Sequence, residues 1–415
     1  MNPEIQSARE AGLSILRPSA AELEKGIEIH RTALVFEPYG LGLCGPLDAA
    51  SLNRELASGA TAPDLRHLGE EQNVLRWTER PEFLREFQEA WEASGVSAVL
   101  VNAGEEGNHP TRMLKRLSRY TQLIDRLPDF LARGTSPSAI REAWRSGRKA
   151  IGFATNGVPL PGTQVSVESE LSLIRVFAGL GVRAMHLTYN RRNVIGDGCG
   201  EKADAGLSDF GSCVVEEMNR AGVLLDLAHS GQQTSLDACR VSRRPVMISH
   251  ATSASLNQHL RAKTDEVVRA VVDTGGVIGV TNVPAFLGRT GDIVAFLDHI
   301  DYLVDRFGWQ SVAIGTDTPY RSMFSVEQRH LLEPWPRTRP HWEALWPGQS
   351  RLSTLGVPSP EGLLSLAWTN FPLFTVGMVQ RGHSEEAIRG ILGENLLRVF
   401  ESTAADLEIL APAAV

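Results

Sequence analysis

Two histidines stand at matching places in the sequence, each at the end of a short apolar run. His229 closes the run at residues 223–229, and His250 closes the run at residues 246–250. Runs of this length are typical of strands buried on both faces, and parallel sheets place their chemistry at the carboxyl ends of such strands. A single strand-end histidine is more often a packed residue than a ligand. Two of them on neighbouring βα units indicate a shared metal or catalytic centre, because neutral imidazoles bind zinc.

A carboxylate and an arginine are further candidates for this centre. Asp317 ends the apolar run at residues 312–317. It could complete the ligand set of a metal or act as the base that takes a proton from water, and the alternative is that it caps the following turn. Arg261 lies on the loop after His250. It could bind a substrate carboxylate in bidentate fashion, or it could be a plain surface arginine.

Polar residues of other apolar runs are predicted to line the same pocket and to bind substrate. Asn156 and Tyr189 end two further runs, and side chains from several strand ends converge at one mouth of a barrel. Asp226 lies inside its run, and the alternation of a strand places it on the face opposite His229. We therefore expect Asp226 to be a buried helper and not a metal ligand.

The apolar runs alternate with helical patterns, which predicts parallel βαβ units. Their number is that of a TIM (β/α)8 barrel, so the predicted fold class is α/β. A doubly wound open sheet ranks second, and the sequence lacks the glycine-rich phosphate motifs of its nucleotide-binding versions. The runs cover residues 32–37, 96–103, 150–156, 182–189, 223–229, 246–250, 276–283 and 312–317.

The chain has 415 residues, a length that a barrel with insertions reaches as one unit. We expect a single barrel domain over residues 1–402 and a loose tail over residues 403–415. The expected additions to the barrel are a leader with one helix (1–31), a helical excursion (43–90), an insertion rich in tryptophan and proline (319–360) and a C-terminal helical extension (361–402).

Composition narrows the class of partner. The net charge is -8, from 41 basic and 49 acidic residues, and the basic residues are scattered. Nucleic acid and anionic membranes are therefore not expected as partners. The four cysteines form no CxxC motif, and the sequence shows no signal-peptide pattern and no apolar run of membrane-spanning length. These features predict a protein of the reducing cytoplasm.

Several motifs, taken together and in this order, resemble the membrane (renal) dipeptidase family of metallopeptidases, within the amidohydrolase superfamily of TIM barrels. The likeness runs from about residue 148 to residue 402 and is weaker before that. The motifs are Leu187-Thr188-Tyr189-Asn190, Gly206-Leu207-Ser208-Asp209-Phe210-Gly211, Asp226-Leu227-Ala228-His229, Val246-Met247-Ile248-Ser249-His250, Ile314-Gly315-Thr316-Asp317 and Glu394-Asn395-Leu396-Leu397-Arg398.

The resemblance implies hydrolysis of dipeptides by water activated between two zinc ions, in an enzyme that commonly forms homodimers. It implies that His229 and His250 hold the second zinc. It also implies that Asp317 is the acid/base group and that Arg261 binds the terminal carboxylate of a dipeptide-like substrate. The expected cofactor is zinc.

The sequence departs from the family where the first zinc is expected. The family ends its first strand with a His-x-Asp pair, and here Tyr39 and Leu41 stand near those places. A bridging glutamate is replaced by Asn156 or Thr155, and a histidine that contacts substrate is replaced by Tyr189. Leucine cannot bind a metal, so a standard two-zinc site is not expected.

Three hypotheses follow from this mixture. The first is a hydrolase with one zinc on His229 and His250, its shell completed by Asp317, Glu37 or water. The second is a metal-free enzyme, such as an epimerase, cyclase or lyase, that uses the same residues as acid/base groups. The third is a non-catalytic relative that binds a ligand.

Overall fold

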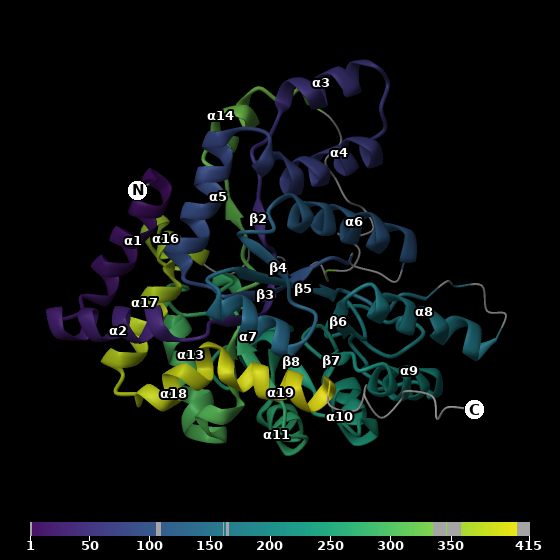
Figure 1. The fold of residues 1–415 in the computed structure, drawn as a ribbon. Helices are drawn as coiled ribbons and strands as arrows, with labels where there is room; N and C mark the ends of the chain where they lie inside the picture. The colour runs from purple at the N-terminus through teal and green to yellow at the C-terminus, as the bar shows by residue number, and fades with distance from the viewer. Residues whose placement is uncertain are drawn as a thin grey trace.

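The computed structural model describes residues 2–104, 109–160, 162, 166–334, 346 and 358–404. Its centre is a nearly closed barrel of eight parallel strands. Figure 1 shows strands at the centre of the molecule with helices around them. The predicted α/β barrel is therefore confirmed, and each of the eight apolar runs overlaps one strand. In barrel order the strands are β1 (Phe36–Gly40), β3 (Ala98–Asn102), β5 (Lys149–Thr155), β6 (Val182–His186), β7 (Leu224–Asp226), β8 (Met247–Ser253), β10 (Val277–Val280) and β11 (Val312–Ile314).

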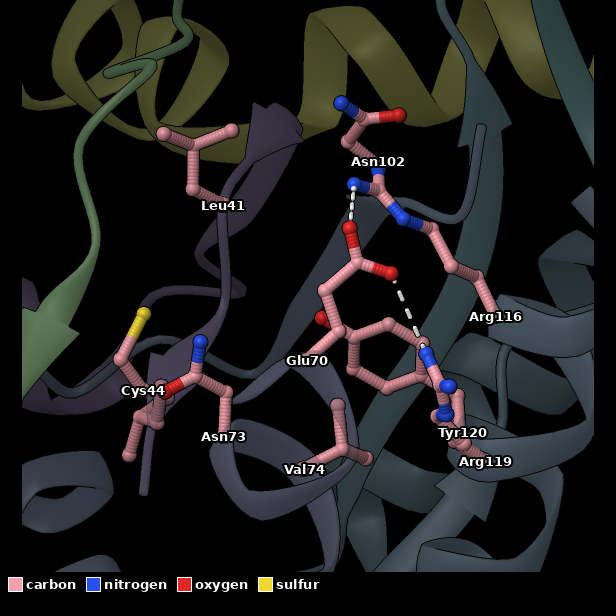
Figure 2. A pocket seen from close by; sticks show the side chains of 10 residues that line it. Leu41, Cys44, Glu70, Asn73, Val74, Asn102, Arg116, Arg119 and Tyr120 are labelled. Carbon is pink, nitrogen blue, oxygen red and sulfur yellow. Dashed lines mark hydrogen bonds and ion pairs between the residues drawn. The ribbon is translucent and has the colours of Figure 1, made fainter. Parts of the chain in front are cut away.

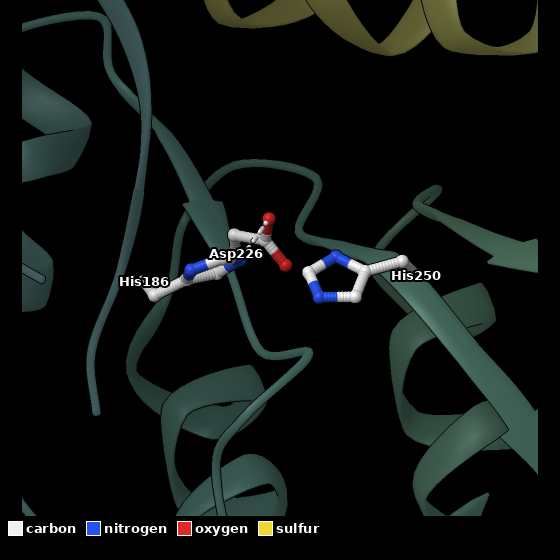
Figure 3. A group of neighbouring side chains, drawn as sticks. All are labelled: His186, Asp226 and His250. Carbon is white, nitrogen blue, oxygen red and sulfur yellow. Dashed lines mark ion pairs between the residues drawn. The ribbon is translucent and has the colours of Figure 1, made fainter. Parts of the chain in front are cut away.

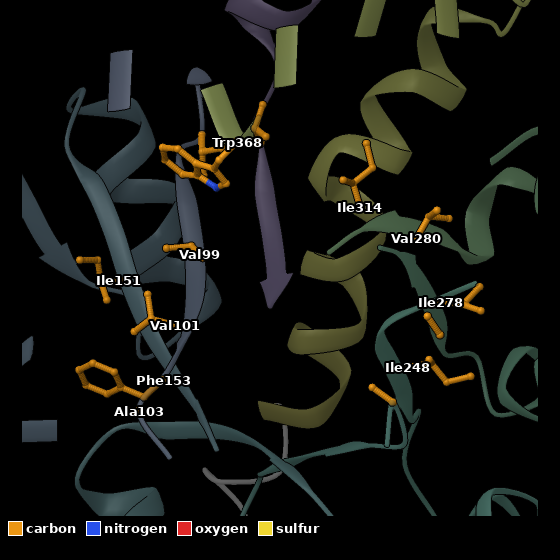
Figure 4. Packing of buried hydrophobic residues seen from close by; sticks show 14 of the residues in the cluster. Val99, Val101, Ala103, Ile151, Phe153, Ile248, Ile278, Val280, Ile314 and Trp368 are labelled. Carbon is orange, nitrogen blue, oxygen red and sulfur yellow. The ribbon is translucent and has the colours of Figure 1, made fainter. Parts of the chain in front are cut away.

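The helices around the barrel begin where the sequence provides a cap. Ser208, Thr264 and Asp292 each accept a backbone N–H of the following first turn, which satisfies donors that have no partner inside the helix. The outer face of the strands packs on the helices through branched apolar residues such as Ile248, Ile278 and Ile314 (Figure 4). The helices of this layer are α6 (Pro110–Arg126), α7 (Pro137–Arg145), α8 (Val167–Gly179), α9 (Asp209–Arg220), α10 (Gln232–Val241), α11 (Asp265–Asp273) and α13 (Ile293–Phe307).

The amino end of the barrel is closed by apolar packing. Small and apolar side chains fill the interior there, and the last helix, α19 (Asn395–Ala404), adds Leu396, Leu397 and Phe400 to the same cluster. The opposite, carboxyl end holds the polar side chains. Among the described residues, this separation places the polar side chains that could carry chemistry at the carboxyl end of the barrel.

The N-terminal leader contains two helices, α1 (Pro3–Leu16) and α2 (Ala20–Thr32), where the sequence predicted one. They pack against helices of the C-terminal extension, so the leader and that extension lie side by side (Figure 1). Gly26 of α2 permits this contact, because a methyl group there would lie 2.7 Å from the backbone of Val376. Val376 belongs to α17 (Phe371–Gln380), in a C-terminal extension that also includes α16 (Pro360–Ser365), η3 (Trp368–Asn370), α18 (Glu385–Arg389) and η4 (Gly390–Glu394).

Additional structure lies beyond the carboxyl ends of β1 and β11. A short strand from each side, β2 (Leu43–Cys44) and β12 (Tyr320–Arg321), forms a separate parallel pair. The helical excursion follows β2, and α14 (Ser325–His330) follows β12; the excursion consists of α3 (Ala49–Ala57), α4 (Ala62–Leu75), η1 (Arg76–Thr78) and α5 (Pro81–Ser94). Most of the predicted insertion, residues 335–345 and 347–357, and most of the predicted tail, residues 405–415, lie outside the described residues.

Among the residues that the structure describes, none of the helices combines the length and the apolar character that crossing a bilayer demands.

Candidate active site

His229 and His250 face each other at the carboxyl end of the barrel. Their Nε2 atoms lie 3.1 Å apart, and both side chains are buried. His250 is part of β8, whereas β7 ends at Asp226 and the following turn brings His229 next to His250. The other ring nitrogens are held by neighbours: His229 Nδ1 lies 2.8 Å from Asn190 Oδ1, and His250 Nδ1 lies 2.7 Å from Ser249 Oγ.

These contacts leave the two Nε2 atoms suited to a metal ion. The Asn190 oxygen accepts a hydrogen bond from the Nδ1–H group of His229, so the lone pair of that imidazole lies on Nε2. Burial, followed by the nearby charge of Arg261, holds the pKa of both histidines well below its usual range, which keeps the rings neutral. Two imidazoles bound to one tetrahedral zinc at 2.0–2.1 Å have their nitrogens about 3.3 Å apart, close to the separation found here.

Asp317 lies beside this pair, after the end of β11. Its Oδ2 atom is 3.9 Å from His250 Nε2, and 23% of its side chain is exposed. Burial raises the pKa of Asp317 to about 7, although the Arg261 charge acts in the opposite direction. Its backbone has φ +56°, a left-handed conformation that is uncommon outside glycine. The three residues expected to converge on one centre are therefore brought together.

Arg261 reaches the same cluster from the segment between β8 and α11 and is fully buried. Its guanidinium donates to the carbonyl oxygens of Ala228 and His250, and its Nη2 lies 3.4 Å from His229 Nε2. Its Nε atom has no partner among the described residues. The alternative of a plain surface arginine is therefore wrong.

Aromatic rings cover both histidines. Tyr39 stacks on His250 and Tyr189 stacks on His229, each with ring centroids 4.1 Å apart. The Tyr39 hydroxyl donates to Asn156 Oδ1 at 2.6 Å, and both of these residues are buried. A phenol and an amide thus occupy the places near which the resemblance implies ligands of a first zinc. This donor set does not fit a second metal ion.

Glu37 does not turn toward the histidines as a spare ligand. Its Oε1 accepts the backbone N–H and the hydroxyl of Thr316, at 2.9 and 2.5 Å, and its Oε2 accepts the indole N–H of Trp368 at 2.9 Å. Both oxygens are already hydrogen-bonded, so the option that Glu37 completes a metal shell has no geometric support.

His186, which the sequence analysis did not single out, lies beneath the two histidines. Its ring centroid is 5.2 Å from that of His229 and 5.5 Å from that of His250. Its Nε2 lies 2.7 Å from Asp226 Oδ2, and its Nδ1 lies 3.1 Å from Asn156 Oδ1. Figure 3 shows this imidazole and carboxylate together, next to the ring of His250.

Asp226 has a second set of contacts that keeps it ionised. Its Oδ1 accepts the backbone N–H groups of Ala228 and Ser249 at 3.1 and 3.0 Å. Burial acts to raise the pKa of Asp226, but the His186 imidazole and these hydrogen bonds outweigh it, and the net pKa is lowered. The expected burial of Asp226 is confirmed, but its expected position opposite His229 is wrong, because both residues contact the His186 ring.

Within the described part of the chain, His186, Asp226 and His250 have potential ligand atoms that all lie within 4.8 Å of one another. The hydrogen bonds weigh against a metal ion among these three. Both nitrogens of His186 face acceptor oxygens, one on Asp226 and one on Asn156, which leaves no lone pair for a metal. We interpret His186 and Asp226 as a buried ion pair.

A signal for His186 is present in the strand register. His186 of β6 is aligned with Asp226 of β7, so their side chains point to the same side of the barrel wall. His186 and Asp226 are polar residues inside neighbouring apolar runs, which is unusual. Aligning the two runs in the correct register would have paired them. The alignment itself is not visible in the sequence.

A pocket of about 240 Å³ lies at the carboxyl ends of β1 and β3 (Figure 2). The Glu70 carboxylate in it accepts from Arg116 at 2.8 Å and from Arg119 at 3.2 Å, and Arg112 also bonds it at 2.8 Å. These ion pairs join α4 to α6. The pocket is not lined by the histidines or by Asp317; its walls are Leu41, Leu43, Cys44, Glu70, Asn73, Val74, Asn102, Arg116, Arg119 and Tyr120.

Known structures share this architecture. An amidohydrolase from Pseudomonas aeruginosa is 24% identical, with 91% of this chain and 98% of that chain covered and a TM-score of 0.67. A probable dipeptidase, PvdM, from Pseudomonas aeruginosa is 16% identical, with coverages of 93% and 99% and a TM-score of 0.63. A metallo peptidase from Rhodobacter sphaeroides, liganded with a phosphinate mimic of the dipeptide L-Ala-D-Ala, is 17% identical, with coverages of 90% and 99% and a TM-score of 0.62. At these identities the similarity shows the fold alone.

The sequence itself matches a family model. The model is that of membrane dipeptidase (peptidase family M19), and the match covers residues 80–326, more than half of the chain. The matched region includes His229, His250 and Asp317, and it ends before the C-terminal helices. The chain therefore belongs to the membrane dipeptidase family, peptidase family M19.

Proposed function

We propose that this protein is a hydrolase that cleaves the amide bond of a small, dipeptide-like substrate with the help of one zinc ion. The observation that carries the proposal is the pair of neutral imidazoles whose Nε2 atoms face each other at 3.1 Å beside the Asp317 carboxylate. Family membership supports a metal-dependent hydrolase. The dipeptide mimic bound by the Rhodobacter sphaeroides relative supports the substrate class.

The residues present support one ion and not two. His229 and His250 would hold it, and a zinc ion held by two imidazoles supplies Lewis-acid chemistry, which polarises a carbonyl and makes water nucleophilic near neutral pH. On the other side of His250, the hydrogen bond from Tyr39 to Asn156 takes the space and the acceptor atom that a second ion would need. We therefore propose a mononuclear centre.

Asp317 is the proposed proton-transfer group between the attacking water and the leaving nitrogen. Its partly exposed carboxylate lies beside His250, where its Oδ2 can accept a proton from the attacking water and return it to the leaving nitrogen. A carboxylate whose pKa is raised toward 7 performs both transfers near neutral pH. The role of Asp317 in the proposal is thus that of a general base and then a general acid.

Arg261 and Tyr189 would position the substrate. The Arg261 guanidinium is buried within hydrogen-bonding range of the histidine cluster and has an Nε–H without a partner in the described chain, so a substrate carboxylate can pair with it. Tyr189 is half-buried and stacks on His229, so it can contact a substrate that approaches this histidine. Asn156 was predicted to bind substrate, but it is buried with its oxygen engaged by Tyr39 and His186, so we assign it to the support of the site.

The test is metal analysis combined with a dipeptide panel. Protein purified without chelator is expected to contain about one zinc per chain and to release amino acids from at least one dipeptide of the panel. Dialysis against EDTA is expected to remove both properties, and added zinc to restore them. Zinc well below one per chain that is unchanged by His229→Ala would overturn the proposal.

A metal-free acid/base enzyme is the second candidate. The observation that favours it is the Arg261 guanidinium, a fixed cation 3.4 Å from the His229 Nε2 atom that would bind zinc. This alternative predicts turnover that survives EDTA. A non-catalytic relative predicts a ligand-dependent rise in melting temperature with no turnover of any dipeptide.

A further inference from the structure

A buried carboxylate bridges the gap in the barrel, between its first and last strands. The hydrogen-bonded path of strands ends at β1 and β11, and Glu37 of β1 lies at this seam, fully buried. Its Oε1 accepts the backbone N–H and the hydroxyl of Thr316, the residue that precedes Asp317. Its side chain thus provides a link across the seam where the strands provide none in their ladder.

The seam is shaped to hold this carboxylate. Gly40 leaves room for it, because a methyl group at that position would lie 2.8 Å from Glu37 Oε2. The second oxygen of Glu37 accepts the indole N–H of Trp368, which belongs to the C-terminal extension. One side chain therefore joins β1, the end of β11 and the C-terminal extension.

Asp317 depends on this link for its backbone conformation. A residue with a side chain in the left-handed region costs about 1–2 kcal/mol and persists only where its surroundings hold it. Thr316 is held by Glu37 through its N–H and hydroxyl and by the Thr281 hydroxyl through its carbonyl oxygen, at 3.1 Å. The Asp317 N–H itself donates to the Tyr39 carbonyl at 3.4 Å. The strongest of these contacts are those of Glu37.

We propose that Glu37 is a positioning residue for the reaction and that Trp368 orients it, so that the C-terminal extension determines where the Asp317 carboxylate points. The inference rests on the proposed role of Asp317 as the proton-transfer group. If these residues only close the barrel, every substitution that removes the same amount of packing here should cause the same loss of stability. The two roles differ in what happens locally at Thr316 and Asp317.

The chain offers a matched pair of variants for this distinction. Trp91 and Trp368 pack edge to face with ring centroids 5.3 Å apart, and both are buried. Trp368 donates its indole N–H to Glu37, whereas the Trp91 indole N–H has no partner among the described residues. Trp368→Phe and Trp91→Phe therefore remove similar apolar area from the same cluster, and only the first removes the hydrogen bond to Glu37.

Glu37→Gln gives a third, independent variant. Glutamine keeps an oxygen for Thr316 but turns an amide N–H₂ toward the Trp368 N–H, which places donor against donor. Glu37→Gln therefore removes the hydrogen bond between Glu37 and Trp368 by changing the acceptor, and it nearly preserves the volume of the side chain.

Amide hydrogen exchange measured by mass spectrometry is the first readout, because it does not require a known substrate. Exchange of the peptide that contains Thr316, Asp317 and Thr318 is expected to be at least tenfold faster in Trp368→Phe and Glu37→Gln than in wild type, and less than twofold faster in Trp91→Phe. Equal exchange in Trp368→Phe and Trp91→Phe would overturn the inference.

The second readout is turnover of whichever dipeptide the wild-type enzyme cleaves. Trp368→Phe and Glu37→Gln are expected to lower kcat about tenfold with KM changed less than twofold, and Trp91→Phe to leave both within twofold. Equal kcat losses in the two tryptophan variants would also overturn the inference. If wild type cleaves nothing, the proposed function fails, and hydrogen exchange still decides whether Glu37 and Trp368 hold Asp317.

Discussion

The two sides of the barrel mouth are built from different chemistry. At the ends of β7 and β8, His229 and His250 point their Nε2 atoms at each other and are supported through Nδ1. At the ends of β1 and β5, Tyr39 and Asn156 are hydrogen-bonded to each other. One side presents neutral nitrogen lone pairs, and the other side presents a donor and an acceptor that satisfy each other.

The contrast teaches that side chains alone can fill one side of the barrel mouth. The Tyr39 ring stacks on His250 and fills the space there. Its hydroxyl donates a hydrogen bond to the Asn156 oxygen, so this oxygen has a partner without an ion. Beneath both sides, His186 bonds Asn156 through one nitrogen and Asp226 through the other. His186 and Asp226 thus connect the side of the two histidines to the side of Tyr39 and Asn156.

The largest expected effect comes from His250→Ala. Removing one of the two proposed zinc ligands is expected to reduce bound zinc from about one per chain to near zero after dialysis. Peptide hydrolysis is expected to fall by more than ~100-fold, because even residues that only support a metal ligand cost 10–100-fold. Metal content by mass spectrometry and initial rates measure the two effects. A His250→Ala variant that keeps its zinc would break the comparison at once.

The next effect is on stability and comes from His186→Leu. The substitution keeps similar volume but leaves the buried Asp226 carboxylate without its cation, which is expected to cost about 3–5 kcal/mol in the free energy of unfolding. Urea denaturation of metal-free protein measures it. His186→Gln, whose amide can still donate to Asp226, is the matched control and is expected to lose clearly less. Equal losses in the two variants would mean that His186 and Asp226 are not an ion pair.

The sequence was sufficient to predict the strands of the barrel but not where each strand begins and ends. All eight apolar runs became strands, because a run buried on both faces is a local property of the chain. The run at 223–229 was read as one strand through His229, yet β7 ends at Asp226 and a turn follows, so alternation failed there. The run at 32–37 began too early, since Thr32 belongs to α2.

The candidate site was predictable where a residue's position along its strand fixes its place. His229, His250 and Asp317 met because the carboxyl ends of parallel strands share one mouth. His186 was missed, because its partner depends on the register between β6 and β7. The hydrogen bond between Tyr39 and Asn156 joins residues that are 117 positions apart in the sequence, and no local sequence pattern predicts such a contact.

The third effect is a pH dependence that Glu37 imposes on the hydrogen-bonded side. Burial raises the pKa of Glu37 to about 7, while its ordinary value is 4.5. The folded state therefore retains a proton that the unfolded state has already lost, and the stability from this group is present below pH 4.5 and lost as the pH rises through about 7. The loss is on the order of 3 kcal/mol.

This dependence is measured by urea denaturation of metal-free protein at several pH values between 4.5 and 8. Asp317, whose pKa is also about 7, adds a loss of the same sign. Glu37→Gln is therefore expected to flatten the profile without removing it. A Glu37→Gln profile parallel to that of wild type would mean that Glu37 is ionised throughout this range.

The smallest effect, and the sharpest test of the comparison, comes from Tyr39→Phe. The variant keeps the ring stacked on His250 and removes the hydroxyl that donates to the buried Asn156 oxygen. The cost is expected to be about 1–2 kcal/mol of unfolding free energy, because the acceptor keeps one other partner, His186. Zinc content is expected to stay at about one per chain, since no ligand is touched. If Tyr39→Phe loses its zinc, the hydroxyl itself takes part in metal binding, and if it acquires a second ion, the hydroxyl keeps that ion out. Either result would mean that the two sides of the mouth are not the separate halves that their hydrogen bonds indicate.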